Sequence, residues 1–106
     1  MLVVSRFPSI EAPGFLAEAQ RALEVLAARP GFRSGRLARA ADDPNAWVLV
    51  TEWENIGAWR RALSAYEVKL ESTPLLARAA DEPSAYEVLV AIDETGTVIT
   101  GSDRTD

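Results

Sequence analysis

The segment AWVLVTEWENIGAWRRALSAYEVKL, residues Ala46–Leu70, decides the fold, because a strand that is apolar on both faces leads directly into an amphipathic helix. Side chains alternate between the two faces of a strand. One face of this strand therefore carries Trp47, Leu49 and Trp53, and the other carries Val48 and Val50. Helices of the same chain are expected to cover one face. The other face needs a different cover, for which we expect a partner subunit.

The rest of the chain predicts the order strand, helix, strand, strand, helix, strand. Apolar residues at helical spacing mark a first helix that ends before Pro30 and Gly31. A turn at Asp42–Asn45 should join the second and third strands as an antiparallel hairpin. The expected strands are residues 2–7, 32–40, 46–53 and 86–92, and the expected helices are residues 15–27, 56–70 and a short 73–80.

The second helix is expected to be continuous. Its apolar stripe advances in alternating steps of three and four, which place one side of a helix against the sheet; the stripe consists of Ile56, Trp59, Leu63, Tyr66 and Leu70. The short helix that follows is expected to begin with Thr73 as a cap and Pro74 at its first position.

This order predicts an α+β fold, a ferredoxin-like split β-α-β unit with a four-stranded antiparallel sheet and two helices on one face. The first 92 residues form the expected domain. Residues 93–106 are expected to be a polar C-terminal tail, or an extension whose extra strand at Thr97–Thr100 pairs with a partner. A homodimer through the open sheet face is the economical way to shield the apolar residues that the helices leave uncovered.

Composition narrows the possible functions. The chain has 106 residues, enough for one domain, and a net charge of -5. Its densest basic group, Arg33, Arg36 and Arg39, is split between two strand faces, so nucleic acid is not an expected partner. There is no cysteine, no apolar run of membrane-spanning length and no signal peptide, which favours a cytoplasmic protein without a membrane partner.

The chain resembles the antibiotic biosynthesis monooxygenase family. The resemblance extends over residues 1–92 and depends on order and spacing; the residues that carry it are Pro30–Phe32, Trp47–Asn55, Pro74–Leu76 and Tyr86–Ile92. It implies a dimeric α+β barrel and, for some members, oxygenation of an aromatic substrate without a cofactor. The absence of histidine disfavours the haem-degrading branch and a metal site.

The resemblance also implies the candidate catalytic residues Asn55, Trp59 and Tyr66. Asn55 and Trp59 match, in type and spacing, the asparagine and tryptophan that line the pocket of cofactor-free members, and Tyr66 is an approximate counterpart of a tyrosine. Each has a second explanation: Asn55 stands where a helix N-cap belongs, and the two aromatic residues fall on the apolar stripe. Arg78 is a further candidate, either as positive charge for an anionic intermediate or as a surface residue.

Three functions follow. The first is a cofactor-independent monooxygenase that oxidises an anthrone, quinol or polyketide-like aromatic molecule with O2. The second is a module that binds or senses a small aromatic ligand without chemistry, and the third is a dimer whose pocket is filled by its own side chains. A cavity of roughly 300 Å³ or more between the sheet and the second helix would exclude the third.

Overall fold

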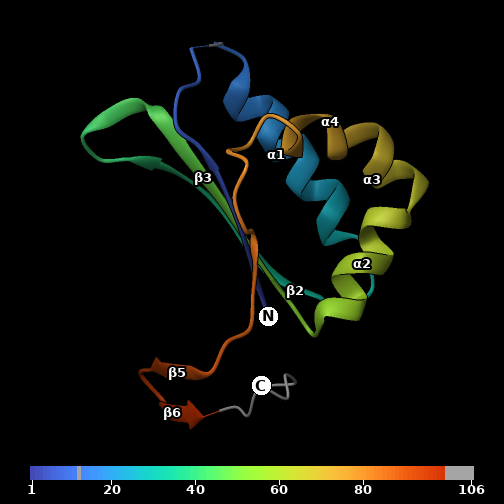
Figure 1. The fold of residues 1–106 in the computed structure, drawn as a ribbon, viewed down its shortest axis with the longest axis vertical. Coiled ribbons are helices and arrows are strands. Elements are labelled where there is room, and N and C mark those ends of the chain that lie inside the picture. Colours follow the sequence, from blue (N-terminus) through green and yellow to red (C-terminus); the bar gives the residue numbers. More distant parts are fainter. Residues whose placement is uncertain (12, 100–106) are drawn as a thin grey trace.

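The main sheet is four-stranded and has helices on one side only (Figure 1). The computed structural model describes residues 1–11 and 13–99. The strand order is β2-β3-β1-β4 with antiparallel neighbours, which confirms the predicted ferredoxin-like fold. The elements are β1 (Leu2–Phe7), α1 (Phe15–Ala27), β2 (Phe32–Ala40), β3 (Asp43–Trp53), α2 (Ile56–Ser64), α3 (Tyr66–Glu71), α4 (Thr73–Leu76), β4 (Ala85–Tyr86), β5 (Val90–Asp93) and β6 (Gly96–Ile99).

Strand β3 pairs with both β1 and β2, so it organises the sheet. Val50 lies opposite Val4 on one side and opposite Arg36 on the other. The β2–β3 hairpin is confirmed, but its turn is tighter than expected. Ala40 already pairs with Asp43, which leaves Ala41 and Asp42 as the turn, and β3 begins at Asp43 instead of Ala46.

The face of the sheet toward the helices forms the core. Leu49, Thr51 and Trp53 of β3 are buried there, as the alternation along the strand predicts. The indole N–H of Trp53 donates to the Thr51 hydroxyl at 2.8 Å, so this buried polar atom is satisfied. The Trp53 ring also lies 5.4 Å from that of Trp59 in α2, which ties the second helix to the centre of the sheet.

The opposite face of the sheet carries no helix (Figure 1). The apolar side chains of Leu2, Val4, Val48 and Val50 alternate with the core residues and are only partly buried. Arg6 and Glu52 flank them. An apolar centre with charged residues at its rim is the composition of a surface that another molecule covers.

The prediction of one continuous helix from Ile56 to Leu70 is wrong. The backbone of Ala65 is extended (φ -70°, ψ 140°), so α2 ends at Ser64 and α3 begins at Tyr66. The Ser64 hydroxyl donates to the Arg60 carbonyl at 3.2 Å, a bond that competes with the helix ladder and bends helices. After the break the inward residue is Val68, which is fully buried, whereas Tyr66 is 73% exposed.

The beginning of the third helical segment also differs from the expectation. Ser72 stands at the N-cap of α4 and Thr73 at its first position, and neither side chain makes a capping hydrogen bond. The Ser72 hydroxyl instead donates to the Ala22 carbonyl of α1 at 2.8 Å, in the buried interior. The expected Thr73 cap is therefore wrong, and a tertiary contact takes the hydroxyl of Ser72, the residue that stands at the cap position.

The prediction of a fourth strand over Tyr86–Ile92 is mostly wrong. Only Ala85 and Tyr86 pair with β1. The chain then leaves the sheet and forms a separate hairpin, β5 with β6, which lies apart from the helical layer (Figure 1). The extra strand expected at Thr97–Thr100 is present to Ile99 but pairs with β5 of its own chain; Thr100 and the rest of the tail lie outside the described residues.

None of the helices in the described part of the chain is long and apolar enough to cross a bilayer. The longest of them, α1, has 13 residues.

Gly31 allows α2 to approach the end of β3. Its φ is +88°, and a Cβ at this position would lie 2.4 Å from the Cβ of Ala58. We predict that Gly31→Ala lowers the free energy of unfolding by about 2–4 kcal/mol, because positive φ and overpacking add. Urea denaturation measures this change. Gly14→Ala is the control, since a Cβ there meets nothing within 4 Å; equal stability of both variants would contradict the prediction.

Candidate functional site

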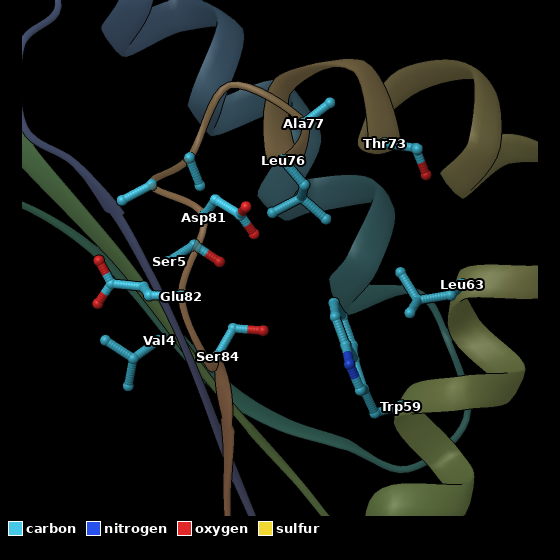
Figure 2. Close-up of a pocket in the computed structure, with 12 residues that line it drawn as sticks. Val4, Ser5, Trp59, Leu63, Thr73, Leu76, Ala77, Asp81, Glu82 and Ser84 are labelled. Carbon is cyan, nitrogen blue, oxygen red and sulfur yellow. The ribbon is translucent and has the colours of Figure 1, made fainter.

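A cavity of about 480 Å³ opens between the edge of β1, α2, α4 and the segment that follows α4 (Figure 2). Its volume falls in the range of small-molecule sites, so the side chains of this chain do not fill it. In the single chain this space exceeds the volume set above for excluding a pocket filled by its own side chains. The lining residues are Val4, Ser5, Trp59, Leu63, Thr73, Leu76, Ala77, Ala79, Ala80, Asp81, Glu82 and Ser84.

The apolar wall of the cavity comes from the helices. Figure 2 shows the Trp59 ring on one side, with Leu63 one turn further along α2 and Leu76 of α4 above. Trp59 is 8% exposed and is held against Trp53 of the core, so its ring presents a fixed flat surface to the cavity. Such a surface suits an aromatic ligand, which stacks on indole at little entropic cost.

The polar wall lies across the cavity from Trp59. Ser5 of β1 and Ser84 supply hydroxyl groups there and Asp81 supplies a carboxylate, whereas the Thr73 hydroxyl lies on the helical side, above Leu63. Sequence reasoning identified none of these residues as site residues. The available signal was the polar sequence Asp-Glu-Pro-Ser directly before the last strand, but a surface loop has the same composition.

The segment from Ala80 to Ser84 is fixed to the edge of the sheet by main-chain hydrogen bonds. The Ala80 amide donates to the Arg6 carbonyl at 2.8 Å, and the Val4 amide donates to the Ser84 carbonyl at 2.7 Å. These two bonds bracket Asp81 and Glu82. The segment thus continues the sheet along the edge of β1.

The two adjacent carboxylates point in different directions. Figure 2 shows Glu82 directed away from the cavity and Asp81 on the cavity side. Arg6 donates to Glu82 through Nη2 at 2.6 Å and through Nε at 3.1 Å. The hydrogen bond from Arg6 is the main cause that lowers the pKa of the Glu82 carboxyl; burial opposes it, and the charge of Arg6 adds a lesser lowering effect.

The structure brings only one of the three candidate catalytic residues to the cavity. Trp59 lines it, whereas Asn55 and Tyr66 are not among the lining residues. Asn55 caps α2: its side-chain oxygen accepts from the Ala58 amide at 2.9 Å, as the second explanation expected. Tyr66 lies beyond the break at Ala65 and faces solvent, so the expected alignment of the three residues along one helix is wrong.

Arg78 is placed on the surface, not in the cavity. Its guanidinium donates to Glu18 of α1 at 2.7 Å and lies 5.4 Å from the centre of the Phe15 ring. This ion pair and cation–π contact fasten the end of α4 to α1. The lining residues of the cavity, all within the described chain, include no lysine or arginine.

Metal ligands are equally scarce. Among residues 1–11 and 13–99 there is no group of three or more acidic, histidine or cysteine residues that could hold a metal ion. The sequence contains neither histidine nor cysteine. The chemistry that the cavity itself offers is therefore an aromatic stacking surface, hydroxyl donors and a carboxylate acceptor.

This combination of fold and cavity defines a ferredoxin-like domain with a cavity of small-molecule size between its sheet and its helices. The chain belongs to the antibiotic biosynthesis monooxygenase family, whose model matches residues 3–69. Those residues include β1, β3 and all of α2, and hence the Trp59 side of the cavity. Among curated proteins no match to the chain is found.

Solved structures show the same fold. The chain is similar to SnoaB, a cofactor-independent oxygenase from Streptomyces nogalater, with 30% identity over 83% of this chain and 94% of SnoaB and a TM-score of 0.67. A SnoaB variant with one asparagine replaced by alanine matches at 26% identity over 98% and 93% of the two chains, also with a TM-score of 0.67. Rv0793 from Mycobacterium tuberculosis matches at 21% identity over 90% and 97%, with a TM-score of 0.63, and shows the shared fold.

The Asn55 cap can be separated from any chemical role of its amide group. We predict that Asn55→Ala lowers the free energy of unfolding by about 1 kcal/mol, whereas Asn55→Asp changes it by only a few tenths, because aspartate caps a helix as well as asparagine does. Urea denaturation at neutral pH measures both. Wild-type stability of the alanine variant would contradict a stabilising cap.

Proposed function

We propose that the protein is a cofactor-independent monooxygenase that oxidises a small aromatic molecule, of the anthrone, quinol or polyketide type, with O2. The observation that carries the proposal is the cavity in which the Trp59 ring faces the hydroxyl groups of Ser5 and Ser84 across a space of ligand size. Family membership and the similarity to SnoaB, a cofactor-independent oxygenase, support it.

The proposed reaction needs little from the protein besides binding and an environment for an anion. The substrate loses a proton and reacts with O2 directly, so that a ring CH2 becomes a carbonyl group. One oxygen atom enters the product and the other leaves as water, and the substrate supplies the electrons. Hydroxyl donors such as those of Ser5, Thr73 and Ser84 stabilise the oxyanion that forms in such a step.

Within this proposal Trp59 is the pocket residue that holds the ring system. Asn55 lies one helical turn before it, and its cap fixes the start of the helix that carries Trp59. We assign Asn55 a positioning role on that basis. The participation of Tyr66 stays a prediction from the family resemblance, since its side chain is exposed in the single chain.

The first test is oxygen uptake by the metal-free protein with anthrones, hydroquinones and naphthols. We predict uptake by the wild type and a loss of at least tenfold in Trp59→Ala, with partial retention in Trp59→Phe, which keeps a ring on the cavity wall. Removing a buried tryptophan costs about 3–5 kcal/mol, so thermal melting must show that both variants are folded. Wild-type uptake by folded Trp59→Ala would contradict the assignment.

The second candidate function is a binding or sensing module on the same fold. The observation that favours it is the lack of a cationic side chain among the lining residues, since a positive charge is the strongest stabiliser of a developing anion. Binding of the same aromatic compounds without oxygen uptake would support this function and exclude the first.

We further propose that two copies associate through the open sheet face. Leu2, Val4, Val48 and Val50 form its apolar centre, and burial of about 800 Å² on each chain is typical of a stable pair. The β5–β6 hairpin offers a second apolar surface, because Ile92 and Ile99 are 74% and 77% exposed in the single chain. The hairpin is our candidate for the partner-pairing extension. A cytoplasmic location remains the expectation from the sequence.

The association has a direct test. We predict that the wild type is a dimer in analytical ultracentrifugation and that Val50→Asp shifts it toward the monomer, because association would strip water from a carboxylate at the apolar centre of the face. Leu16→Asp is the matched control, since Leu16 is exposed on the helical side of the molecule. A wild type that sediments as a monomer at tens of micromolar would contradict the proposal.

A further inference from the structure

One charged group in the cavity has no role in the fold. Among the described residues, the Asp81 carboxylate has no hydrogen-bond or ion-pair partner, whereas Glu82 next to it is paired with Arg6. Figure 2 shows the Asp81 side chain on the cavity side of the segment, facing the space in front of Leu76 and Trp59. A carboxylate in this position is available to a ligand.

The position of Asp81 is set by the sheet. The hydrogen bonds from the Ala80 amide to Arg6 and from the Val4 amide to Ser84 hold the backbone on both sides of it. The bidentate pair of Arg6 with Glu82 lies on the other side of the segment and keeps Glu82 out of the cavity. The backbone at Asp81 is therefore held in place before a ligand binds, which lowers the entropic cost of the contact.

The charge of the cavity follows from this arrangement. Glu82 is neutralised by Arg6, and the lining residues include no lysine or arginine that would neutralise Asp81. An ionised carboxylate only accepts hydrogen bonds, so it favours a ligand that offers an O–H or N–H donor. It disfavours a ligand that carries its own carboxylate, because like charges repel.

We propose that Asp81 determines the specificity of the cavity by accepting a hydrogen bond from a hydroxyl group on a neutral aromatic ring system that lies against Trp59. This role of Asp81 in binding rests on the cavity of the proposed function. Asp81 takes part in one further step only if the protein is the proposed monooxygenase. In that step the hydroxyl O–H bond breaks, a new O–H bond forms on the Asp81 carboxylate, and the electron pair stays on the substrate oxygen. Asp81 is exposed, so the proton can pass from it to water.

The test uses binding, which does not require turnover. Isothermal titration calorimetry under nitrogen compares 1-naphthol, 1-methoxynaphthalene and 1-naphthoate as probes of the wild type and of Asp81→Asn. We expect the wild type to bind 1-naphthol about tenfold or more tightly than 1-methoxynaphthalene, which has no donor, and to bind 1-naphthoate most weakly. In Asp81→Asn the preference for naphthol falls and the binding of naphthoate improves.

Asp42→Asn is the matched control. It removes the same charge in the turn between β2 and β3, away from the cavity, and should keep the wild-type order of the three probes. The proposal is overturned if the wild type binds methoxynaphthalene as tightly as naphthol, if it binds none of the probes, or if Asp81→Asn keeps the wild-type preference.

Oxygen uptake separates this inference from the proposed function. If the wild type shows the expected binding order but consumes no oxygen, the monooxygenase proposal fails while the specificity role of Asp81 stands. If the wild type consumes oxygen, Asp81→Asn should lose at least tenfold in kcat at saturating substrate. A full kcat in that variant would overturn the proton-transfer step.

Discussion

The structure depends on the burial of β3, which is paired on both edges and apolar on both faces. Its helix-facing residues, ending in Trp53, anchor the core, and the ring of Trp53 contacts that of Trp59 in α2. Because this strand occupies the middle of the sheet, its outward valines reach the centre of the open face. One strand therefore requires both the helical layer and a cover on the opposite side.

The cavity exists because the sheet is incomplete at its β1 edge. Strand β4 contributes only two residues, and the polar segment before it continues along β1 as an irregular strand. The helices α2 and α4 stand off from this edge, and the space between them is closed on one side by Trp59. A full fourth strand lying under the helices would leave less room, so the cavity is a consequence of the irregular edge.

Short-range patterns predicted the parts of the fold that depend on local chemistry. The bounds of β1, α1 and β2 agree with the expectation, because clear signals at Pro8, Pro30 and Gly31 delimit them. The break at Ala65 and the short β4 were not predicted. At the break, a buried position for Val68 outweighs the regular stripe; after Tyr86, the residues from Val90 to Asp93 pair with β6 and not with β1.

The sequence by itself determined the fold class, the two-faced apolar strand and the importance of Trp59, because periodicity and residue type are local properties. Only the tertiary structure decided which polar residues surround that tryptophan. Ser5, Asp81 and Ser84 come from segments almost 80 residues apart in the chain, and hydrogen bonds between β1 and the segment before β4 bring them together. It also removed Asn55, Tyr66 and Arg78 from the cavity, since a cap, a helix break and an ion pair direct their side chains elsewhere.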